Sequence, residues 1–228
     1  MIGKSEINIF IPAYNEAATI AQVIQDIRSL GYQKIFVVDD GSTDQTNAQA
    51  THAEAEIITH LINRGAGAAT QTAIECARQL NLQYILLMDA DGQHLPQDID
   101  KLVKRMSKGD CDLVIGSRFL NNVQGMPLSR KWFNHIANWL TNLVCQKHYT
   151  DSQSGLRMLN RKAVERLHLK LDEFGFCSEM IYLAEQGNLI IAEVPTETVY
   201  TPYSLNKGQN FFKGIQTALS LISKIIFR

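Results

Sequence analysis

The segment INIFIPAYNEAATIAQVIQDIRSLGYQKIFVVDD, residues 7–40, decides the class of the fold. It opens and closes with short apolar runs, 7–11 and 34–38, each ending at polar residues, as buried parallel strands do. Between the runs, residues 17–30 place apolar side chains at helical spacing, and Gly31 stands where a helix C-cap glycine belongs. The segment therefore predicts a strand, a helix and a second strand in succession.

The same alternation continues through the first half of the chain. Apolar runs predict strands at 56–62, 84–88 and 112–115, and periodic segments predict helices at 68–80 and 98–106. Such alternation is typical of an α/β domain with an open, mostly parallel sheet and helices on both faces. Ligands of these sheets bind beyond the carboxyl ends of the strands, which is where this sequence places its polar motifs.

After Phe119 the regular alternation of predicted strands and helices ends. A helix is predicted at 132–145, a strand at 189–194 and an amphipathic C-terminal segment at 211–228. The apolar side of the helix at 132–145 consists of Trp132, Phe133, Ile136, Trp139, Leu140 and Leu143. Such a side either packs on the core or lies in a membrane interface, and the sequence leaves both open.

Composition narrows the class of protein. With 228 residues, 45% of them hydrophobic, the chain is long enough for one core and short for two. A net charge of −1 provides no basic field for a polyanion, so nucleic acid is not an expected partner. The cysteines are too widely spaced for a typical zinc site, so we expect them to be reduced thiols. They are Cys76, Cys111, Cys145 and Cys177.

The two ends of the chain bear on location. The polar start leads directly into a strand, which predicts a cytoplasmic protein without a signal peptide. The apolar stretch at 211–227 contains lysines and is shorter than the roughly 20 apolar residues of a spanning helix. Its mixture of basic and apolar side chains predicts peripheral attachment at the cytoplasmic membrane face, or pairing with another subunit or a membrane protein.

An acidic pair, Asp89 and Asp91, follows the predicted strand at 84–88. Two carboxylates this close can share Mg²⁺ or Mn²⁺, and a nucleotide diphosphate can supply the remaining oxygen ligands. The metal would neutralise the charge that develops on a leaving diphosphate. The competing interpretation is a solvated turn, since Asp and Gly are common in turns.

A second acidic pair, Asp39 and Asp40, follows the predicted strand at 34–38. A carboxylate at this place can accept hydrogen bonds from a nucleobase N–H and a ribose hydroxyl. Ser42 or Thr43 can also cap a helix that begins near Asp44.

The glycine turn at 63–69, Asn-Arg-Gly-Ala-Gly-Ala-Ala, opens a predicted helix. It approximates the dinucleotide-binding pattern of a Rossmann unit. Thr70 stands where the third small residue of that pattern belongs, which makes the dinucleotide interpretation the weaker one.

Several blocks together resemble the family 2 glycosyltransferases, which have the GT-A fold. They occur in the family's order, and the resemblance covers nearly the whole chain, including Glu179. It implies one catalytic domain, 1–228, with a nucleotide-sugar half at 1–119 and an acceptor half at 120–228. The blocks are IPAYNE at 11–16, VVDDGSTD at 37–44, LMDADGQH at 87–94, GSRF at 116–119, DSQSGLR at 151–157 and EVP at 193–195.

The blocks at 89–94 and 151–157 are similar to those of the polyprenyl-phosphate branch, which includes dolichyl-phosphate mannose synthases. Two departures stand out. Ser154 replaces the branch's usual Cys, and the segment 203–208 replaces its usual Arg-bearing phosphate loop. The second departure bears on the acceptor.

The resemblance implies roles for individual residues. Pro12, Tyr14, Glu16, Asp40 and Gly67 match the nucleoside pocket. The metal and diphosphate site is implied at Asp89, Ala90, Asp91 and Gln93, with Asp89, Asp91 and Gln93 toward Mg²⁺ or Mn²⁺. Phosphate contacts are expected from Arg118 on the donor side, and from Arg130, Arg157 and Lys207 on the acceptor side.

The implied reaction is an inverting transfer from GDP-mannose or a UDP-hexose to a polyprenyl phosphate, either dolichyl or undecaprenyl. Asp91 and Arg118 are the expected catalytic residues. A saccharide or other hydroxyl acceptor is the alternative, and it would need a general base, for which Glu179 or Asp151 is the candidate. A nucleotide-binding protein without transferase activity is a third possibility, against which the presence of both Asp89 and Asp91 argues.

Overall fold

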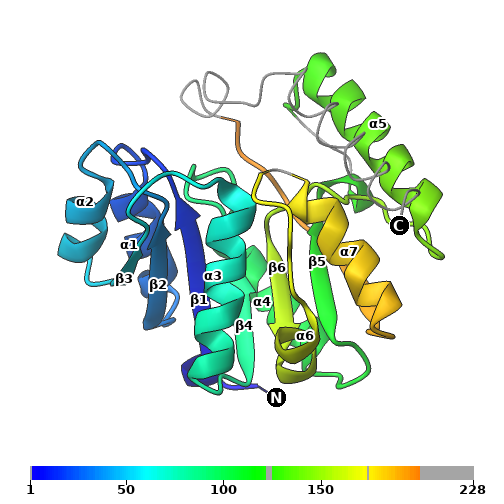
Figure 1. Cartoon of the computed structure of the whole chain (residues 1–228), viewed down its shortest axis with the longest axis horizontal. Helices are drawn as coiled ribbons and strands as arrows, with labels where there is room; N and C mark the ends of the chain where they lie inside the picture. Colours follow the sequence, from blue (N-terminus) through cyan, green and yellow to red (C-terminus); the bar gives the residue numbers. More distant parts are fainter. Residues whose placement is uncertain (1, 122–124, 174, 201–228) are drawn as a thin grey trace.

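A seven-stranded sheet forms the centre of the computed structural model, which describes residues 2–121, 125–173 and 175–200 (Figure 1). The strand order is β3-β2-β1-β4-β6-β5-β7. Every pairing is parallel except those of β6, which runs antiparallel to both of its neighbours, β4 and β5. The strands are β1 (Ile7–Ala13), β2 (Lys34–Asp39), β3 (Glu56–Thr59), β4 (Tyr84–Leu87), β5 (Leu113–Ser117), β6 (Arg157–Asn160) and β7 (Ile191–Pro195).

Helices cover both faces of this sheet. Short 3₁₀ turns occur at Lys4–Glu6 and Arg118–Leu120. The α-helices are α1 (Ile20–Ser29), α2 (Thr46–His52), α3 (Ala66–Gln79), α4 (Asp98–Met106), α5 (Leu128–Val144), α6 (Arg161–Arg166) and α7 (Phe176–Gln186). Helices α1, α2 and α4 contribute to one hydrophobic core layer, and α3, α6 and α7 to the other (Figure 1).

Strand β1 shows why the two layers form. Ile9 and Ile11 point into the layer beneath α1 and α4, whereas Phe10 points into the other layer and stacks on Phe36 of β2 at 4.6 Å. Because successive side chains of a strand point to opposite faces, a continuous apolar run is buried on both sides of the sheet. The run at 7–11 therefore specifies an inner strand.

Helix α5 lies away from the two core layers, at the upper right of Figure 1. Its buried residues are Asn134, Ala137, Asn138 and Thr141, while Trp132 and Trp139 are 69% and 61% exposed. The helix therefore turns polar side chains inward and large apolar ones outward. Of the two alternatives that the sequence leaves open for this side of the helix, packing on the core does not hold for either tryptophan.

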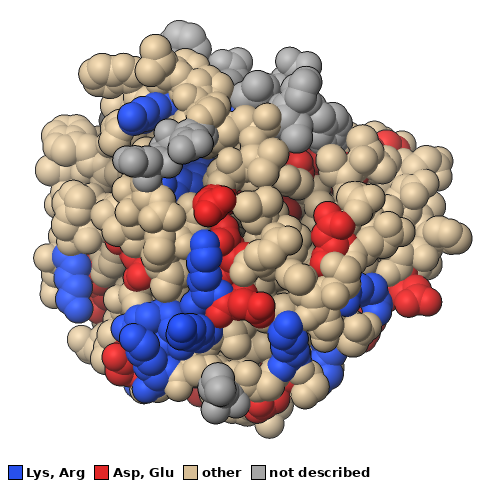
Figure 2. All heavy atoms as spheres, turned by 180° about the vertical axis from the view of Figure 1, so that it is seen from behind, with Lys and Arg blue, Asp and Glu red and all other residues tan. Residues whose placement is uncertain are grey.

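The rear face of the molecule carries charges of both signs, side by side (Figure 2). Ion pairs occur on α1 and α4, between Arg28 and Glu54 and between Lys101 and Asp98. Within the described part of the chain, no helix is both long enough and apolar enough to cross a bilayer.

The predicted α/β class and mostly parallel sheet are confirmed, and the predicted strands and helices are present with ends shifted by a few residues. Strand β6 and helices α6 and α7 are additions to the prediction. The division at residue 119 stays a prediction. The amphipathic segment 211–228 and Lys207 lie outside the described residues.

Candidate active site

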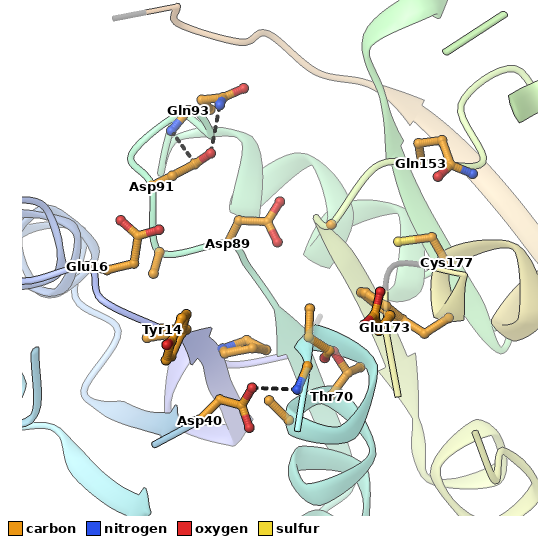
Figure 3. Close-up of a pocket in the computed structure, with 18 of the residues that line it drawn as sticks. Tyr14, Glu16, Asp40, Thr70, Asp89, Asp91, Gln93, Gln153, Glu173 and Cys177 are labelled. Carbon is orange, nitrogen blue, oxygen red and sulfur yellow. Dashed lines mark hydrogen bonds between the residues drawn. The ribbon is translucent and has the colours of Figure 1, made fainter. Parts of the chain in front are cut away.

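A pocket of about 630 Å³ opens beyond the carboxyl ends of the parallel strands (Figure 3). Residues from both halves of the chain line it. Those expected from the sequence are Pro12, Tyr14, Glu16, Asp40, Asp89, Ala90, Asp91, Gln93, Arg118 and Arg130. The structure thus brings Asp40, Asp89 and Asp91, which come from two loops far apart in the sequence, to one cavity.

Other lining residues were not expected from the sequence. Asn63, Gly65, Ala66, Ala69 and Thr70 come from the glycine turn and the first turns of α3. From this turn the sequence indicates only Gly67 for the site, and the position of the whole turn directly after β3 is the signal for the other residues. The second half supplies Ser129, Phe133, Asn134, Gln153, Gly155, Glu173, Phe176 and Cys177.

The loop after β4 presents two carboxylates to the pocket. Asp89 has a half-exposed side chain, and its Oδ2 lies 3.0 Å from Nε2 of the buried His94. The surrounding pocket walls desolvate this carboxylate in part, which would raise the pKa of Asp89, but the hydrogen bond and charge of His94 hold that pKa below its ordinary value. Asp91 accepts hydrogen bonds from Nε2 of Gln93 at 2.6 Å and from its backbone N–H at 3.0 Å.

These carboxylates suit a divalent cation that arrives with a diphosphate. No group of three His, Cys, Asp or Glu side chains that could hold a metal occurs among the described residues. Mg²⁺ usually binds one or two protein carboxylates and takes its other oxygens from phosphates and water. Burial and the charge of Asp89 raise the pKa of Asp91, and a bound cation would relieve that repulsion.

Gly155 makes room for the Asp89 carboxylate. A β-carbon at position 155 would overlap both carboxylate oxygens of Asp89. Because β6 is antiparallel, the segment that precedes it arrives at the edge where β4 ends, with Arg157 opposite Leu87. The reversed strand therefore delivers residues 151–156 to the acidic loop.

Asp40 is buried, and its carboxylate accepts hydrogen bonds from within the protein. Oδ1 lies 2.7 Å from Nδ1 of His60 and accepts from the backbone N–H of Arg64 at 3.0 Å. Oδ2 accepts from Nδ2 of Asn63 at 3.0 Å and from the backbone N–H of Gly65 at 2.7 Å. Asp40 therefore holds the glycine turn in place, in addition to lining the pocket.

The structure gives Gly67 and Glu179 roles other than the expected ones. Neither residue lines the pocket. A β-carbon at Gly67 would overlap the carbonyl of Leu171, so the close approach at this glycine is to the chain itself and not to a nucleoside. The Glu179 carboxylate accepts from the backbone N–H groups of Lys170 and Leu171 at 2.9 to 3.1 Å, which positions that segment over α3.

Asp151 and Arg157, also expected in the site, are fully buried beneath it. Asp151 receives two hydrogen bonds of 2.7 Å from the Arg118 guanidinium, so it is an ion-pair partner and not an available base. Burial opposes the charge of Arg118, but Asp151 outweighs it and raises the pKa of Arg118. Arg157 donates to the carbonyls of Ser152, Ser154 and Cys177, which commits its guanidinium to the backbone instead of an acceptor phosphate.

The polar face of α5 is hydrogen-bonded to the segment that enters the site. Asn138 donates to the carbonyl of Thr150 at 2.6 Å and accepts from the backbone N–H of Ser152 at 2.8 Å. Thr141 donates to the hydroxyl of Ser152 at 3.1 Å. Helix α5 therefore fixes the position of the loop that carries Gln153 and Gly155.

A strap at 196–200, which follows β7, crosses the loop that carries Asp91. Thr198 forms a β-bridge with His94, and the backbone N–H of Val199 donates to the carbonyl of Gln93 at 2.9 Å. The backbone N–H of Glu197 donates to Asp98 at the start of α4 at 2.7 Å. The acidic loop is thus held from the second half of the chain.

Comparison with solved structures supports the fold. The chain superposes with a TM-score of 0.74 on glucosyl-3-phosphoglycerate synthase from Mycobacterium tuberculosis in complex with Mn²⁺, uridine diphosphate and glucosyl-3-phosphoglycerate. The match covers 96% of this chain and 78% of that one, at 18% sequence identity. At this identity the likeness bears on the fold alone.

Sequence comparison identifies the family. The chain is 39% identical to an uncharacterised protein of Methanocaldococcus jannaschii, over 99% of this chain and 95% of that protein. It is 34% identical to the UDP-N-acetylglucosamine--dolichyl-phosphate N-acetylglucosaminyltransferase of Methanococcus voltae, over 95% of this chain and 94% of the relative. The model of glycosyl transferase family 2 matches residues 8–168. With the two acidic loops on one pocket of a GT-A sheet, these matches show that the chain is a glycosyltransferase and belongs to family 2.

Proposed function

We propose that this glycosyltransferase moves a sugar from a nucleoside diphosphate sugar to the phosphate of a polyprenyl phosphate at a membrane surface, with Mg²⁺ or Mn²⁺. Both archaeal and bacterial relatives support this acceptor class. The Methanococcus voltae relative is named for dolichyl phosphate. The polyprenol monophosphomannose synthase of Mycolicibacterium smegmatis is 28% identical over 82% of this chain and 75% of its own length.

Helix α5 is the observation that carries the acceptor proposal. One side of the helix lines the pocket through Ser129, Arg130 and Phe133, while Trp132 and Trp139 are exposed on another. Indole rings favour the boundary between water and hydrocarbon. An acceptor whose phosphate lies in the pocket and whose chain lies in a membrane would have to pass this helix.

The donor would lie across residues of the first half, from Tyr14 and Asp40 to Asp89 and Asp91. Uridine is the nucleoside that the Methanococcus voltae name favours, and a GDP-sugar is the alternative outcome of the test. Asp89 and Asp91 would hold the cation, with Gln93 orienting Asp91 through its amide. The cation, when bound, would stabilise negative charge on the departing diphosphate.

In the proposed reaction an oxygen of the acceptor phosphate attacks the anomeric carbon of the sugar. A carbon–oxygen bond forms to the acceptor while the bond to the donor diphosphate breaks, and its electron pair leaves with the nucleoside diphosphate. The anomeric configuration inverts. Arg130 lines the acceptor side of the pocket, where a guanidinium can bind the attacking phosphate.

The state of the two candidate bases favours a phosphate acceptor over a hydroxyl. An acceptor phosphate is already ionised at neutral pH, whereas a hydroxyl needs a base. Asp151 is paired with Arg118, and Glu179 holds the segment at Lys170. Neither carboxylate lines the pocket.

The direct test is transfer into lipid. Full-length protein would be incubated with radiolabelled UDP-N-acetylglucosamine, UDP-glucose or GDP-mannose, with Mn²⁺ and vesicles that contain dolichyl or undecaprenyl phosphate. The expected product is a lipid-extractable sugar phosphate that disappears when a chelator is added. Transfer to a free saccharide, without a lipid product, would select the hydroxyl acceptor instead.

Membrane attachment can be tested separately on α5. Replacing Trp132 and Trp139 by serine should lower vesicle binding in a flotation assay while leaving the fold unchanged, because both side chains are exposed. Leu80→Ser is the matched control, since Leu80 is also exposed but follows the end of α3 remote from the pocket. Equal flotation of the double variant and the control would contradict attachment through α5.

A further inference from the structure

This inference rests on the proposed function and concerns the sugar that is transferred. Gln153 lines the pocket from the second half of the chain, on the segment that precedes β6. Figure 3 places it on the far side of Asp89 from Tyr14 and Asp40, the residues proposed for the nucleoside. Because the nucleoside would lie on one side of the diphosphate, the sugar would extend toward the other side, where Gln153 lies.

The hydrogen bonds beneath Gln153 fix the direction of each proton. Nδ2 of Asn138 donates to the carbonyl of Thr150 at 2.6 Å, and its Oδ1 accepts from the backbone N–H of Ser152 at 2.8 Å. Backbone groups therefore determine how this amide is turned. The Ser152 hydroxyl lies 2.8 Å from the same Oδ1 and must donate to it, because an amide oxygen only accepts. Ser152 Oγ thus has only lone pairs left for Gln153.

The amide of Gln153 is held by both of its N–H groups. Nε2 lies 3.0 Å from Oγ of Ser152 and 3.0 Å from Oγ of Ser178 on α7. A flipped amide would place Oε1 against the lone pairs of Ser152, so Nε2 is the end that faces the protein. Ser152, Ser178 and Thr141 of α5, which shares a 2.7 Å hydrogen bond with Ser178, are all buried. The orientation of the amide is therefore set within the protein, before any ligand arrives.

The amide oxygen is the atom that Gln153 has left for a ligand. Among the described residues, the hydrogen bonds of its side chain are made through Nε2 alone. An amide oxygen accepts hydrogen bonds and cannot donate them. The diphosphate and a fully ionised acceptor phosphate present only lone pairs, and the polyprenyl chain has no polar group. On this side of the pocket, the sugar is the part of the two substrates that carries O–H or N–H groups.

We infer that Gln153 is a specificity-determining residue for the transferred sugar, whose Oε1 accepts a hydrogen bond from one hydroxyl or acetamido N–H of that sugar. Ser152 and Ser178 are its positioning residues. The amide cannot turn over without facing Ser152 with its oxygen. A sugar that lacks a donor at the matching carbon therefore leaves Oε1 without a partner and binds more weakly.

The test separates the sugar from the nucleotide. Titration calorimetry with UDP and with UDP-N-acetylglucosamine, in Mn²⁺ buffer without acceptor, would be run on the wild type, Gln153→Ala and Gln71→Ala. Gln71 is the matched control, because it is also a partly exposed glutamine whose amide is bound within the protein, to the backbone N–H of Leu169 at 2.7 Å, but it does not line the pocket. Gln153→Ala should bind the sugar nucleotide about fivefold more weakly, as the loss of one neutral hydrogen bond predicts, and should bind UDP as the wild type does. Gln71→Ala should leave both affinities unchanged.

Deoxy analogues identify the group that Gln153 binds. The analogues of UDP-N-acetylglucosamine without the hydroxyl at C3, C4 or C6 each lack one donor, and UDP-2-deoxyglucose is compared with UDP-glucose for C2. The wild type should bind one of these analogues about fivefold more weakly than its parent, and in Gln153→Ala that difference should disappear. Gln153→Met, which keeps most of the volume without the acceptor, takes the place of Gln153→Ala if the alanine variant does not fold.

Ser178→Ala tests the positioning role. It leaves one N–H of Gln153 without its acceptor and loosens the amide. Affinity for UDP-N-acetylglucosamine should fall about twofold to threefold, affinity for UDP should not change, and the substitution should have no further effect in Gln153→Ala. A merely structural role for Ser178 would weaken both ligands alike.

The outcomes separate the two proposals. If the wild type binds neither UDP nor UDP-N-acetylglucosamine, the same series is run with GDP and GDP-mannose, and failure of both pairs overturns the proposed donor and this inference with it. If the sugar nucleotide binds, but a folded Gln153→Ala or Gln153→Met keeps full affinity for it, sugar recognition by Gln153 is overturned while the proposed function stands. The wild type alone overturns the inference if every deoxy analogue binds as tightly as its parent.

Discussion

The two acidic loops of this enzyme look alike in sequence and differ in what their carboxylates do. Asp39 ends β2 and Asp40 follows it, whereas Asp89 and Asp91 follow β4. The two strands lie on either side of β1 and run parallel to it. Asp39 and Asp40 are each only 2% exposed and bind groups within the protein. Asp89 is half exposed, and Asp91 binds only its neighbour Gln93 among the contacts described.

The difference lies in what surrounds each strand end. The loop after β2 meets the glycine turn, whose backbone N–H groups need acceptors, and Asp40 supplies them. The loop after β4 meets Gly155, which has no side chain to fill the space beside Asp89. The first acidic pair therefore supports the architecture, and the second leaves carboxylate oxygens for a ligand. Four substitutions test this contrast.

The largest effect is expected from Asp91→Ala. Removing a carboxylate that binds the cation should reduce transfer by a factor of about 1,000 or more, near 4 kcal/mol of transition-state stabilisation. Stability should change by less than about 0.5 kcal/mol, because the side chain has few protein partners. Radiolabelled transfer and urea denaturation measure the two quantities. Normal, chelator-sensitive transfer by this variant would place the metal elsewhere, and normal transfer in excess chelator would show that the reaction needs no metal.

Asp40→Ala should show the opposite pattern, with stability as the main loss. It leaves His60, Asn63 and two backbone N–H groups without their acceptor, which should cost about 3 kcal/mol in the free energy of unfolding. Urea denaturation followed by circular dichroism measures it. If the variant is as stable as the wild type, Asp40 does not have the structural role that distinguishes its loop from the loop of Asp91.

Gly155→Ala tests whether the space beside Asp89, across the pocket, is what leaves its carboxylate available to a ligand. The new methyl group would overlap the Asp89 carboxylate and force it away from His94. Transfer should fall by about 30-fold, near 2 kcal/mol, because the carboxylate is displaced from its binding position. Stability should change little, since the half-exposed side chain can turn toward solvent. An unchanged midpoint in a Mn²⁺ titration of activity would count against this account.

Gln93→Ala should have the smallest effect of the four. The substitution removes the 2.6 Å hydrogen bond from the amide to Asp91 and keeps the carboxylate itself. The Mn²⁺ concentration that gives half-maximal activity should rise about fivefold, close to 1 kcal/mol. A loss as large as that of Asp91→Ala would instead make Gln93 a direct ligand, as its sequence position implies.

The parts of the fold that sequence analysis predicted are those with local periodicity. The runs at 7–11 and 34–38 are apolar throughout because both faces of β1 and β2 are covered. Strand β6 gives no such signal, because it is short and begins with Arg157, a charged residue that is buried with its guanidinium bound to backbone carbonyls. Its direction depends on neighbours far away in the sequence.

The site was predicted best where motifs follow strands directly. Asp89, Asp91 and Tyr14 reach the pocket because strand ends put them there. The sequence wrongly places the carboxylates of Asp151 and Glu179 in the site. A sequence alone does not distinguish a charged residue that is buried in an ion pair or a loop contact from one that faces a ligand. For α5, the sequence showed two unlike faces but carried no signal for which one meets the protein.

The strap at 196–200 makes the position of the acidic loop sensitive to where the polypeptide is cut. Limited proteolysis or shortening before Thr196 would remove the bridge to His94 and the hydrogen bond to Gln93 together, freeing the loop from one side. A cut after Tyr200 would spare both contacts. Among the described residues that follow β7, it is therefore 196–200 whose removal would loosen the acidic loop.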